Sequence, residues 1–495
     1  MFNKRICILL LLQCISCMIV HPLKAEISAQ SAEEMATGTS SRNAKISLAE
    51  VAPELYYQLR RYPKFYGDDN TIHGGLLERS YLLGNLGGLR DTMVDHGLYF
   101  DVSITQFLQG NSTGGEEQGS ARYNGTADYW LTFDTGKAGL WSGGMVFLHA
   151  ESSWQADRSV NSDVGSLLPA NYDAAMPTAG DSEGIALPEL YFLQALPANL
   201  FVVAGKADWA AFAENNVFAN NERTQFGYTG LVNNPILGAF VPYTPLGALA
   251  FWVPSKEHAL AVVAVQSTAN ATTSGFDNFN GDYSIGVQYQ FSPTLGRNLP
   301  GNYRIIGGYS NEDLSSFDID PRHLIGEIIG VVPVAKESEN YAVLINFDQY
   351  LWVKEGSLAA YNKRLETSEY PGVGRHHLPP VGIGIFGRAG WSPDDRNVID
   401  QFYSFGIGGY GMIIPGRDQD QWGVGWAGTH ISSDLRGILG SSDVDLDDME
   451  HAFEAFYNVQ LTPATHLTLS AQIIDSAAKS LGTAYTLGTR LQIDF

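Results

Sequence analysis

The chain ends on a strict alternation of apolar and polar side chains, Thr489–Phe495. Successive side chains of a β-strand point to opposite faces, so Leu491, Ile493 and Phe495 share one face and the polar residues between them share the other. A soluble protein would have to cover the first face with a core and leave the second in water. A closed barrel in a membrane satisfies both faces, with lipid outside and a hydrated lumen inside. The end of the chain therefore predicts a membrane-spanning strand.

Composition favours a barrel over a helical membrane protein. The chain contains 24 Tyr, 24 Phe, 9 Trp and 53 Gly, and charged residues make up only 17% of it. Such a chain is rich in strand and turn formers and poor in the Lys and Glu of soluble helices. After residue 20 no apolar run is long enough for a spanning helix, which leaves a closed sheet as the way to cross a bilayer. The net charge of −23 argues against nucleic acid as a partner.

The start of the chain has the form of a secretory signal peptide. Lys4 and Arg5 precede an apolar stretch at 6–20, and Leu23-Lys24-Ala25 supplies a cleavage site. We expect residues 1–25 to be removed, which leaves no thiol for a disulfide, a metal or a nucleophile. The alternative is a lipoprotein acylated at Cys17. The 3 cysteines of the chain all lie in this stretch, at Cys7, Cys14 and Cys17.

Residues 26–74 lack strand alternation. Within them Leu55, Leu59 and Tyr62 are spaced as on one face of a short helix, and the preceding stretch is rich in Ser, Thr and Ala. We expect a periplasmic N-terminal extension, partly disordered or helical, with a merely flexible tether as the alternative.

Residues 75–495 form a series of expected strands. Leu98–Thr105, Tyr283–Phe291 and Leu467–Ile473 alternate between apolar and small polar residues, and the polar face indicates a wet lumen. About 400 residues, at roughly 25 for each strand with its loop, give some 16 strands. The prediction is an all-β transmembrane antiparallel β-barrel of that size, which leaves a water-filled channel.

The expected connections alternate in length, as in outer-membrane barrels with long external loops and short periplasmic turns. Gly-rich polar clusters are typical of long loops and Pro-containing links of short turns. The expected long loops are 111–119, 270–281 and 437–448, and the expected short turns are 196–198, 292–293 and 462–464.

A set of short motifs runs through the expected barrel. In order, they are Leu82–Arg90, Gly97–Asp101, Gly110–Gly115, Glu189–Tyr191, Ala204–Lys206, Gly384–Arg388, Pro415–Asp420, then Glu450, Glu454 and Tyr457, and finally Leu487–Arg490. This ordered set resembles the OprB-type carbohydrate-selective porins of Gram-negative outer membranes. The resemblance implies a 16-stranded barrel through which sugars, glucose-like ones in particular, diffuse passively into the periplasm.

The chain departs from the family pattern in two places. The family usually has Asp-Trp before the paired glycines, where this chain has Asn85 and Leu86. The exchange is harmless if those residues only shape the entry to the barrel, and it changes the substrate if they hold sugar. The family's surface-layer homology module is absent, which favours an ordinary Gram-negative envelope.

Charged side chains and aromatic rings are the groups that recognise a neutral sugar, through its hydroxyls and through the apolar face of its ring. Arg388 and Arg417 are the first candidates for a constriction, and Trp130 and Trp209 are either stacking platforms or lipid-interface aromatics. For each charged residue the alternative is a wall salt bridge without sugar contact. The candidate pore-lining residues are Arg388, Arg417, Arg490, Lys206, Glu189, Glu454, Asp134 and Trp154.

Enzyme-like and metal-like patterns have simpler explanations. Ser112 sits in a G-x-S-x-G match, but the glycine-rich stretch after it does not predict the helix of a nucleophile elbow. Gly406–Gly411 matches G-x-G-x-x-G without a following helix. The acidic stretch Asp443–Glu450 fails the calcium-loop pattern because Asp448 replaces its glycine, and adjacent His376-His377 would point apart. We expect no catalytic residue, cofactor or metal.

Three functions stay open. The first is sugar-selective diffusion, the second a general porin or adhesin that works through its loops, and the third an enzyme built on a barrel, such as a lipase. The expected partners are small sugars and the outer-membrane lipid with its lipopolysaccharide, and the protein is expected to be a monomer or a trimer.

Overall fold

A computed structural model describes residues 72–155, 158–175, 185–267, 274–276, 281–296, 298–317, 336–367, 379–440 and 445–495. The predicted signal peptide and nearly all of the predicted extension lie outside these ranges.

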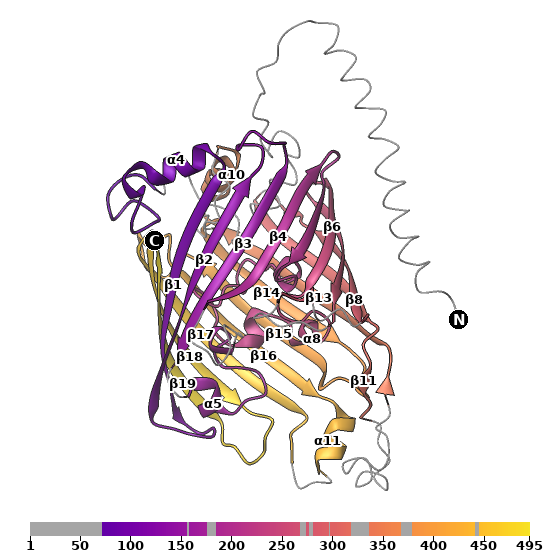
Figure 1. Ribbon diagram of the computed structural model, residues 1–495. Coiled ribbons are helices and arrows are strands. Elements are labelled where there is room, and N and C mark those ends of the chain that lie inside the picture. Colours follow the sequence, from indigo (N-terminus) through magenta and orange to yellow (C-terminus); the bar gives the residue numbers. More distant parts are fainter. Residues whose placement is uncertain are drawn as a thin grey trace, which may run out of the picture. The chain divides into compact units, whose positions relative to one another are not determined.

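The described chain forms a closed antiparallel barrel (Figure 1). Its main sheet contains 17 strands, of which the two-residue β9 (Thr294–Leu295) pairs only with the start of β10, so that 16 strands form the wall. The predicted fold is therefore confirmed. The wall strands are β1 (Leu98–Thr113), β2 (Ser120–Asp134), β3 (Gly144–Gln155), β4 (Ala186–Leu196), β5 (Leu200–Lys206), β6 (Leu246–Ser255), β7 (His258–Gln266), β8 (Tyr283–Phe291), β10 (Leu299–Ser310), β13 (Asn340–Val353), β14 (Gly382–Trp391), β15 (Ile399–Tyr410), β16 (Gln421–Ile431), β17 (Met449–Thr462), β18 (Thr465–Asp475) and β19 (Ala484–Asp494).

Helices and a small second sheet occupy the connections. None of the helices in the described ranges is long and apolar enough to cross a membrane. The helices are η2 (Leu86–Gly88), α4 (Leu89–Asp95), α5 (Val160–Val164), η3 (Asp173–Ala175), α6 (Ala210–Ala213), α7 (Thr229–Val232), α8 (Pro235–Gly238), α10 (Ser357–Thr367) and α11 (Ser433–Gly440), and the small sheet pairs β11 (Leu314–Ser315) with β12 (Lys336–Glu337).

The last strand closes the ring as its alternation predicts. β19 pairs with β1 in the register Ser103↔Asp494 and Phe107↔Arg490. The even-numbered side chains of β19 are the buried ones at its end, with Arg490 1% exposed, whereas Leu487 on the other face is 65% exposed. The charged face of this strand therefore points into the barrel and its apolar face points outward.

Connection lengths distinguish the two ends of the barrel. At the end that carries the C terminus, turns 197–199, 256–257 and 463–464 join neighbouring strands, which confirms the predicted short turns at 196–198 and 462–464. We call this the short-turn end; its exception is the connection that contains α10. The opposite, long-loop end carries the connections 156–185 and 207–245, which we call the first and second inward loops.

The segment before β1 is fixed to the closing seam of the ring. Arg90 on α4 donates to the carbonyl oxygens of Gly84 at 2.7 Å, Phe100 at 3.3 Å and Phe495 at 2.5 Å. The backbone N–H of Leu82 donates to the carbonyl of Asp494 at 2.7 Å. One buried guanidinium thus holds the helix, the first strand and the last residue together.

The outer face of the barrel is apolar and aromatic. Trp154 on β3 hydrogen-bonds the Tyr123 hydroxyl at 3.0 Å near the long-loop end, and Trp252 and Tyr289 are exposed near the short-turn end. Aromatic residues at both rims of an apolar band are typical of membrane barrels.

Apolar side chains occupy part of the lumen. A buried apolar cluster joins residues of the two inward loops, such as Val164 of the first and Leu231 of the second, to inward residues of the wall, such as Phe386 and Phe402. A second cluster covers the inner face of β3–β7, where Leu193 and Phe201 are almost fully buried. The inward loops bring their own apolar side chains, which find partners on the inner face of the wall and fill part of the barrel.

Candidate functional site

The second inward loop leaves β5 and returns to β6, and in between it crosses to the opposite wall. Its helices α7 and α8 lie against β16 and β15, and Figure 1 shows α8 within the barrel, close to β13 and β15. Backbone groups in such a short, irregular segment need partners when water is excluded. Side chains of the wall supply them.

Arg388 on β14 is the central anchor of this loop. Its Nε lies 2.5 Å from Oε2 of Glu214. Its Nη atoms donate to the carbonyl oxygens of Leu231 at 3.2 Å, Val232 at 2.8 Å and Ala219. The buried guanidinium therefore binds both arms of the loop at once.

Arg490 and Glu454 hold the tip of the same loop from the neighbouring wall. Arg490 donates to the carbonyl oxygens of Glu222 and Gln225. Glu454 accepts from the N–H groups of Gly227 and Tyr228, both at 2.8 Å. The structure thus places three predicted lining residues, Arg388, Arg490 and Glu454, as anchors of a loop.

Glu450 ties the two inward loops together. Its carboxylate accepts from the N–H groups of Leu167 at 2.7 Å and Leu168 at 3.0 Å in the first loop, and from the Tyr228 hydroxyl at 3.0 Å in the second. Sequence analysis grouped Glu450 with an acidic external stretch, and that grouping is wrong because the residue faces the lumen on β17. Asp443 and His376-His377 lie outside the described residues.

A cluster of charged side chains lies where the second loop meets β2, β3 and β4. Arg223 of the loop reaches Oδ1 of Asp128 at 2.5 Å. His149 bridges Asp128 at 2.8 Å and Glu189 at 3.0 Å, and stacks on Trp130 with ring centroids 4.9 Å apart. The guanidinium of Arg223 also lies 5.5 Å from the Trp130 ring centroid. The loop and the wall are therefore bridged by an ion pair beside an aromatic ring.

Half-buried polar residues continue this cluster. They are Tyr172 in the first loop and Asp208, Glu222 and Tyr243 in the second. The pKa of Tyr172 is raised well above its usual value by burial and then by the negative charges of Asp208 and Glu222. Burial also raises the pKa of Tyr243, together with the charges of Glu151 and Asp208. These phenols stay neutral donors among carboxylates.

Asp173, on η3 of the first loop, faces the same cluster. Its Oδ2 lies 3.9 Å from Nε of Arg223 and accepts from the Thr126 hydroxyl at 3.1 Å. Burial raises its pKa well above the usual range, and the Arg223 charge offsets this only in part. Burial therefore favours the neutral form of Asp173 within the cluster.

The remaining predicted residues fall into three groups. Glu189 joins the charged cluster through His149 and also accepts from the Asp208 N–H at 2.9 Å. Lys206 is buried at the end of β5 and donates to the Leu187 carbonyl at 3.2 Å. Asp134 and Arg417 stabilise short turns: Asp134 accepts from the Gly136 N–H at 2.8 Å, and Arg417 pairs with Asp420 at 2.6 Å.

Two tryptophan predictions are corrected by the direction of the side chains. Trp154 pairs across the sheet with Gly125, and both lie on the outer face, one position out of phase with the inward His149. It therefore faces lipid and does not line the pore. Trp209 is 3% exposed, and its ring N–H donates to the Pro245 carbonyl at 2.8 Å, so it supports the second loop.

Sequence reasoning missed the residues that form the charged cluster. Asp128 and His149 do occupy inward positions of alternating strands. Asp128 lies two residues before Trp130, so extending the alternation along the strand from Trp130 would have found it. Arg223 had no such signal, because it belongs to a loop without periodicity.

The cluster does not suit a divalent cation. Ligand atoms of Asp128, His149 and Glu151 lie within 4.8 Å of one another. However, the same Asp128 oxygen already accepts from Arg223 at 2.5 Å and lies 2.8 Å from His149 Nε2. A guanidinium at that distance repels a metal ion, so the set is better described as an ion-pair network.

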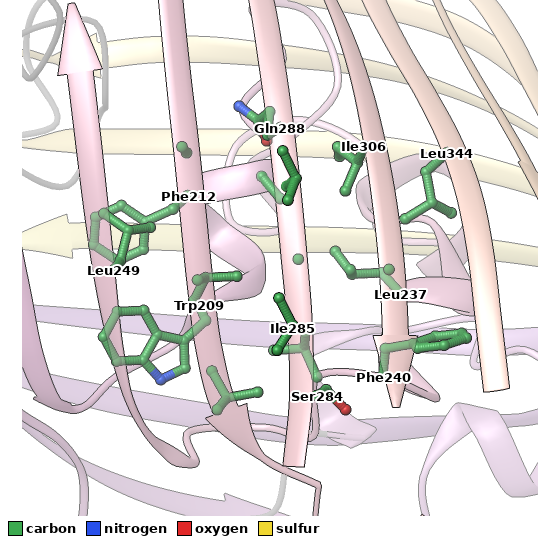
Figure 2. Close-up of a pocket in the computed structure, with 18 of the residues that line it drawn as sticks. Trp209, Phe212, Leu237, Phe240, Leu249, Ser284, Ile285, Gln288, Ile306 and Leu344 are labelled. Atoms are coloured by element: carbon green, nitrogen blue, oxygen red, sulfur yellow. The ribbon is translucent and has the colours of Figure 1, made fainter. Parts of the chain in front are cut away.

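An apolar cavity lies behind the second loop, against β6–β8, β10 and β13 (Figure 2). It encloses ≈ 50 Å³, and Figure 2 shows Trp209, Phe212, Leu237 and Phe240 among its lining residues. Ser284 and Gln288 are its polar members among the labelled residues. A space of this size holds a few waters at most and offers almost no partners for hydroxyl groups, so it is not a sugar path.

Ser112 shows no catalytic setting. It lies near the end of β1, and its hydroxyl donates to the Tyr485 carbonyl at 2.8 Å. A short loop and then β2 follow, in place of the helix that a nucleophile elbow requires.

A closed barrel of 16 antiparallel strands, apolar outside and narrowed by loops that fold inward, defines a porin of the bacterial outer membrane. The family model described as "Carbohydrate-selective porin, OprB family" matches residues 118–495. The chain therefore belongs to the OprB family of carbohydrate-selective porins, and its family and fold are those of a channel.

A solved structure with a TM-score above 0.5 supports this fold. The high-pH structure of Pseudomonas putida OprB matches with a TM-score of 0.69 at 16% identity, covering 85% of this chain and 100% of that one. Its low-pH structure gives a TM-score of 0.49 at 15% identity, covering 84% and 99%. The outer membrane channel DcaP of Acinetobacter baumannii gives 0.44 at 10% identity, covering 80% and 97%. A search of curated proteins found no match.

Proposed function

We propose that sugars cross this porin through an eyelet between the tip of the second inward loop and the inner face of β2–β4. The observation that carries the proposal is the bond between Arg223 of the loop and Asp128 of the wall, at 2.5 Å. It joins the second inward loop to the wall and brings charged groups and phenols to one place. In outer-membrane barrels short turns face the periplasm, so sugar would enter from the side of the inward loops.

The eyelet offers the groups that a sugar needs. Carboxylates such as Glu222 accept hydrogen bonds from sugar hydroxyls, and Arg223 donates to them. Tyr172 and Tyr243 offer ring faces for the apolar side of a pyranose, and their raised pKa values keep their hydroxyl groups neutral. Binding of the sugar must stay weak, because a tightly held solute would not leave the pore. We expect glucose-sized sugars to be the best fit.

Replacing Arg223 tests the eyelet. The Arg223→Ala variant, reconstituted in a planar bilayer, should conduct more ions than the wild type and lose most of its block by glucose, because the bridge across the lumen is gone. The matched control is Arg417→Ala, which removes an arginine from a turn at the short-turn end. Unchanged conductance and glucose block in the Arg223 variant would place the sugar path elsewhere.

A general diffusion porin is the alternative. Liposome swelling separates the two functions, because a general pore passes amino acids and sugars of equal size at equal rates. A selective eyelet should pass the sugar several-fold faster. Equal rates would leave the porin without the proposed selectivity.

We propose that each barrel works as a complete pore, in a monomer or a trimer. The anchors and the eyelet described above all come from one chain, so neighbouring copies are not needed for passage. Conductance steps counted after insertion at low protein concentration test this, since a trimer of independent pores closes in three equal steps.

A further inference from the structure

Inward carboxylates outnumber inward bases along the described wall. At such positions, alternation and burial place the acids Asp101, Asp128, Glu151, Glu189, Asp348, Glu450, Glu454 and Asp494, and the bases Arg122, Arg304, Arg388 and Arg490, with Lys206 at the end of β5. Several of these residues form ion pairs, as Arg304 does with Asp348 at 3.5 Å. Each such pair adds no net charge, so the remaining carboxylates decide the sign. The excess is negative.

The eyelet repeats this excess. Its described carboxylates are Asp128, Glu189, Asp208 and Glu222, whereas its bases are Arg223, Lys206 and the bridging His149. The sum is negative even when His149 is protonated. Asp173 and Glu151 are left out, because their burial favours the neutral acid.

A negative excess in a narrow, low-dielectric passage acts on every charged solute that enters. Walls of low dielectric focus the field into the water between them, which raises the local concentration of cations and lowers that of anions. A neutral sugar is not affected by this term. The field attracts a sugar with an ammonium group and repels a sugar with a carboxylate or a phosphate.

We infer that this porin admits neutral sugars and cationic amino sugars and turns back anionic sugars, namely uronates and sugar phosphates. The inference rests on the proposed eyelet and adds the charge class of its substrates. The half-buried Glu222 and Asp208 of the second loop are the specificity-determining residues, because they carry the excess at the place where the loop narrows the path.

Ion selectivity tests the inference independently of sugar. Across a tenfold KCl gradient, the full-length protein in a planar bilayer should prefer K⁺ over Cl⁻ by about five- to tenfold. Asp208→Asn with Glu222→Gln should bring the ratio close to one, because both changes keep size and hydrogen bonding but remove charge. The matched control is Glu257→Gln in the exposed turn between β6 and β7, which should keep the wild-type ratio. A preference for Cl⁻, or no change in the double variant, overturns the inference.

Liposome swelling then tests the sugars themselves. Glucosamine should enter at least as fast as glucose, and glucuronate and glucose 6-phosphate several-fold more slowly; the double variant should narrow this gap. Equal entry of glucose and glucuronate into wild-type liposomes overturns the charge preference and leaves the proposed function standing. Failure of glucose itself to enter removes the proposed function, whatever the ion ratio.

Discussion

At the scale of single residues, the charged groups of this barrel bind different parts of the structure. Arg388 is fully buried and binds Glu214 and the second inward loop, whereas Arg417 is partly exposed and binds a turn. Removing one member of a buried pair leaves an uncompensated charge and costs about 3 to 5 kcal/mol. Arg388→Met should therefore lower the thermal stability of the detergent-solubilised protein and give larger, noisier single-channel currents, because the loop loses its anchor.

Arg417→Ala is the matched comparison and has its own pH signature. Burial alone would raise the pKa of Asp420, but hydrogen bonds from Arg417 and Tyr457 outweigh it and hold the pKa below its usual value. A lowered pKa stabilises the fold at pH values above the unfolded pKa of about 4 and ceases to do so as the pH falls through the folded pKa. At neutral pH the variant should be less stable than the wild type by about 1 kcal/mol. The effect is this small because Arg417 is partly exposed to solvent. In melting curves recorded at decreasing pH, its difference from the wild type should shrink as Asp420 takes up a proton, and a constant difference at all pH values would contradict the assignment.

At the scale of elements, alternation predicted the wall but not what fills it. The inward direction of Arg490 follows from its place between Leu491 and Thr489, because a strand leaves a side chain only two directions. Arg388 and Glu454 were predicted to be inward for the same reason, and they are. Their partners were not predictable, since the second inward loop has no period and its path depends on distant walls.

The role of the family signature at Leu82–Arg90 could also be predicted only in part from the sequence. Asn85, which stands where the family usually has an acid, accepts from the Asp91 N–H at 3.0 Å and so shapes the start of α4. This contact supports the alternative in which the position shapes the entry to the barrel. The same stretch contains Arg90, whose role at the seam depends on the C terminus and could not be read locally.

Packing between the second inward loop and the wall can be improved or disturbed by a single methyl group. A Cβ added to Gly308 on β10 would lie 3.5 Å from Phe240, an ordinary contact at the apolar cavity. Gly308→Ala should raise stability by about 0.5 to 1 kcal/mol, because it also restricts the unfolded chain. Gly384→Ala is the opposite control, since its Cβ would lie 2.4 Å from the Phe218 ring. It should lower the melting temperature by overpacking; a rise in both variants would contradict this description of the loop contact.

At the scale of the whole molecule, a barrel is only as stable as the pairing of its first and last strands. A sheet with a free edge in lipid would leave backbone groups without partners, so closure is the condition for spanning the membrane. β1 and β19 meet this condition along most of their length. At the short-turn end of the seam, Arg90 of α4 also binds the last residue of the chain. Strand pairing thus closes the ring, and Arg90 ties the entry of the chain to its seam.

Loss of Arg90 should therefore weaken the ring rather than the eyelet. In Arg90→Ala three carbonyl groups lose their shared donor, and unpaired buried groups cost about 1 to 3 kcal/mol each. The folded band of the unboiled protein on a denaturing gel should disappear at a lower temperature than in the wild type, while glucose block and the K⁺ to Cl⁻ ratio stay the same. Lys479→Ala, which removes an exposed pair with Asp445, should leave the gel transition unchanged. A wild-type transition in the Arg90 variant would mean that strand pairing alone closes the barrel, and altered glucose block would mean that the seam and the eyelet are coupled.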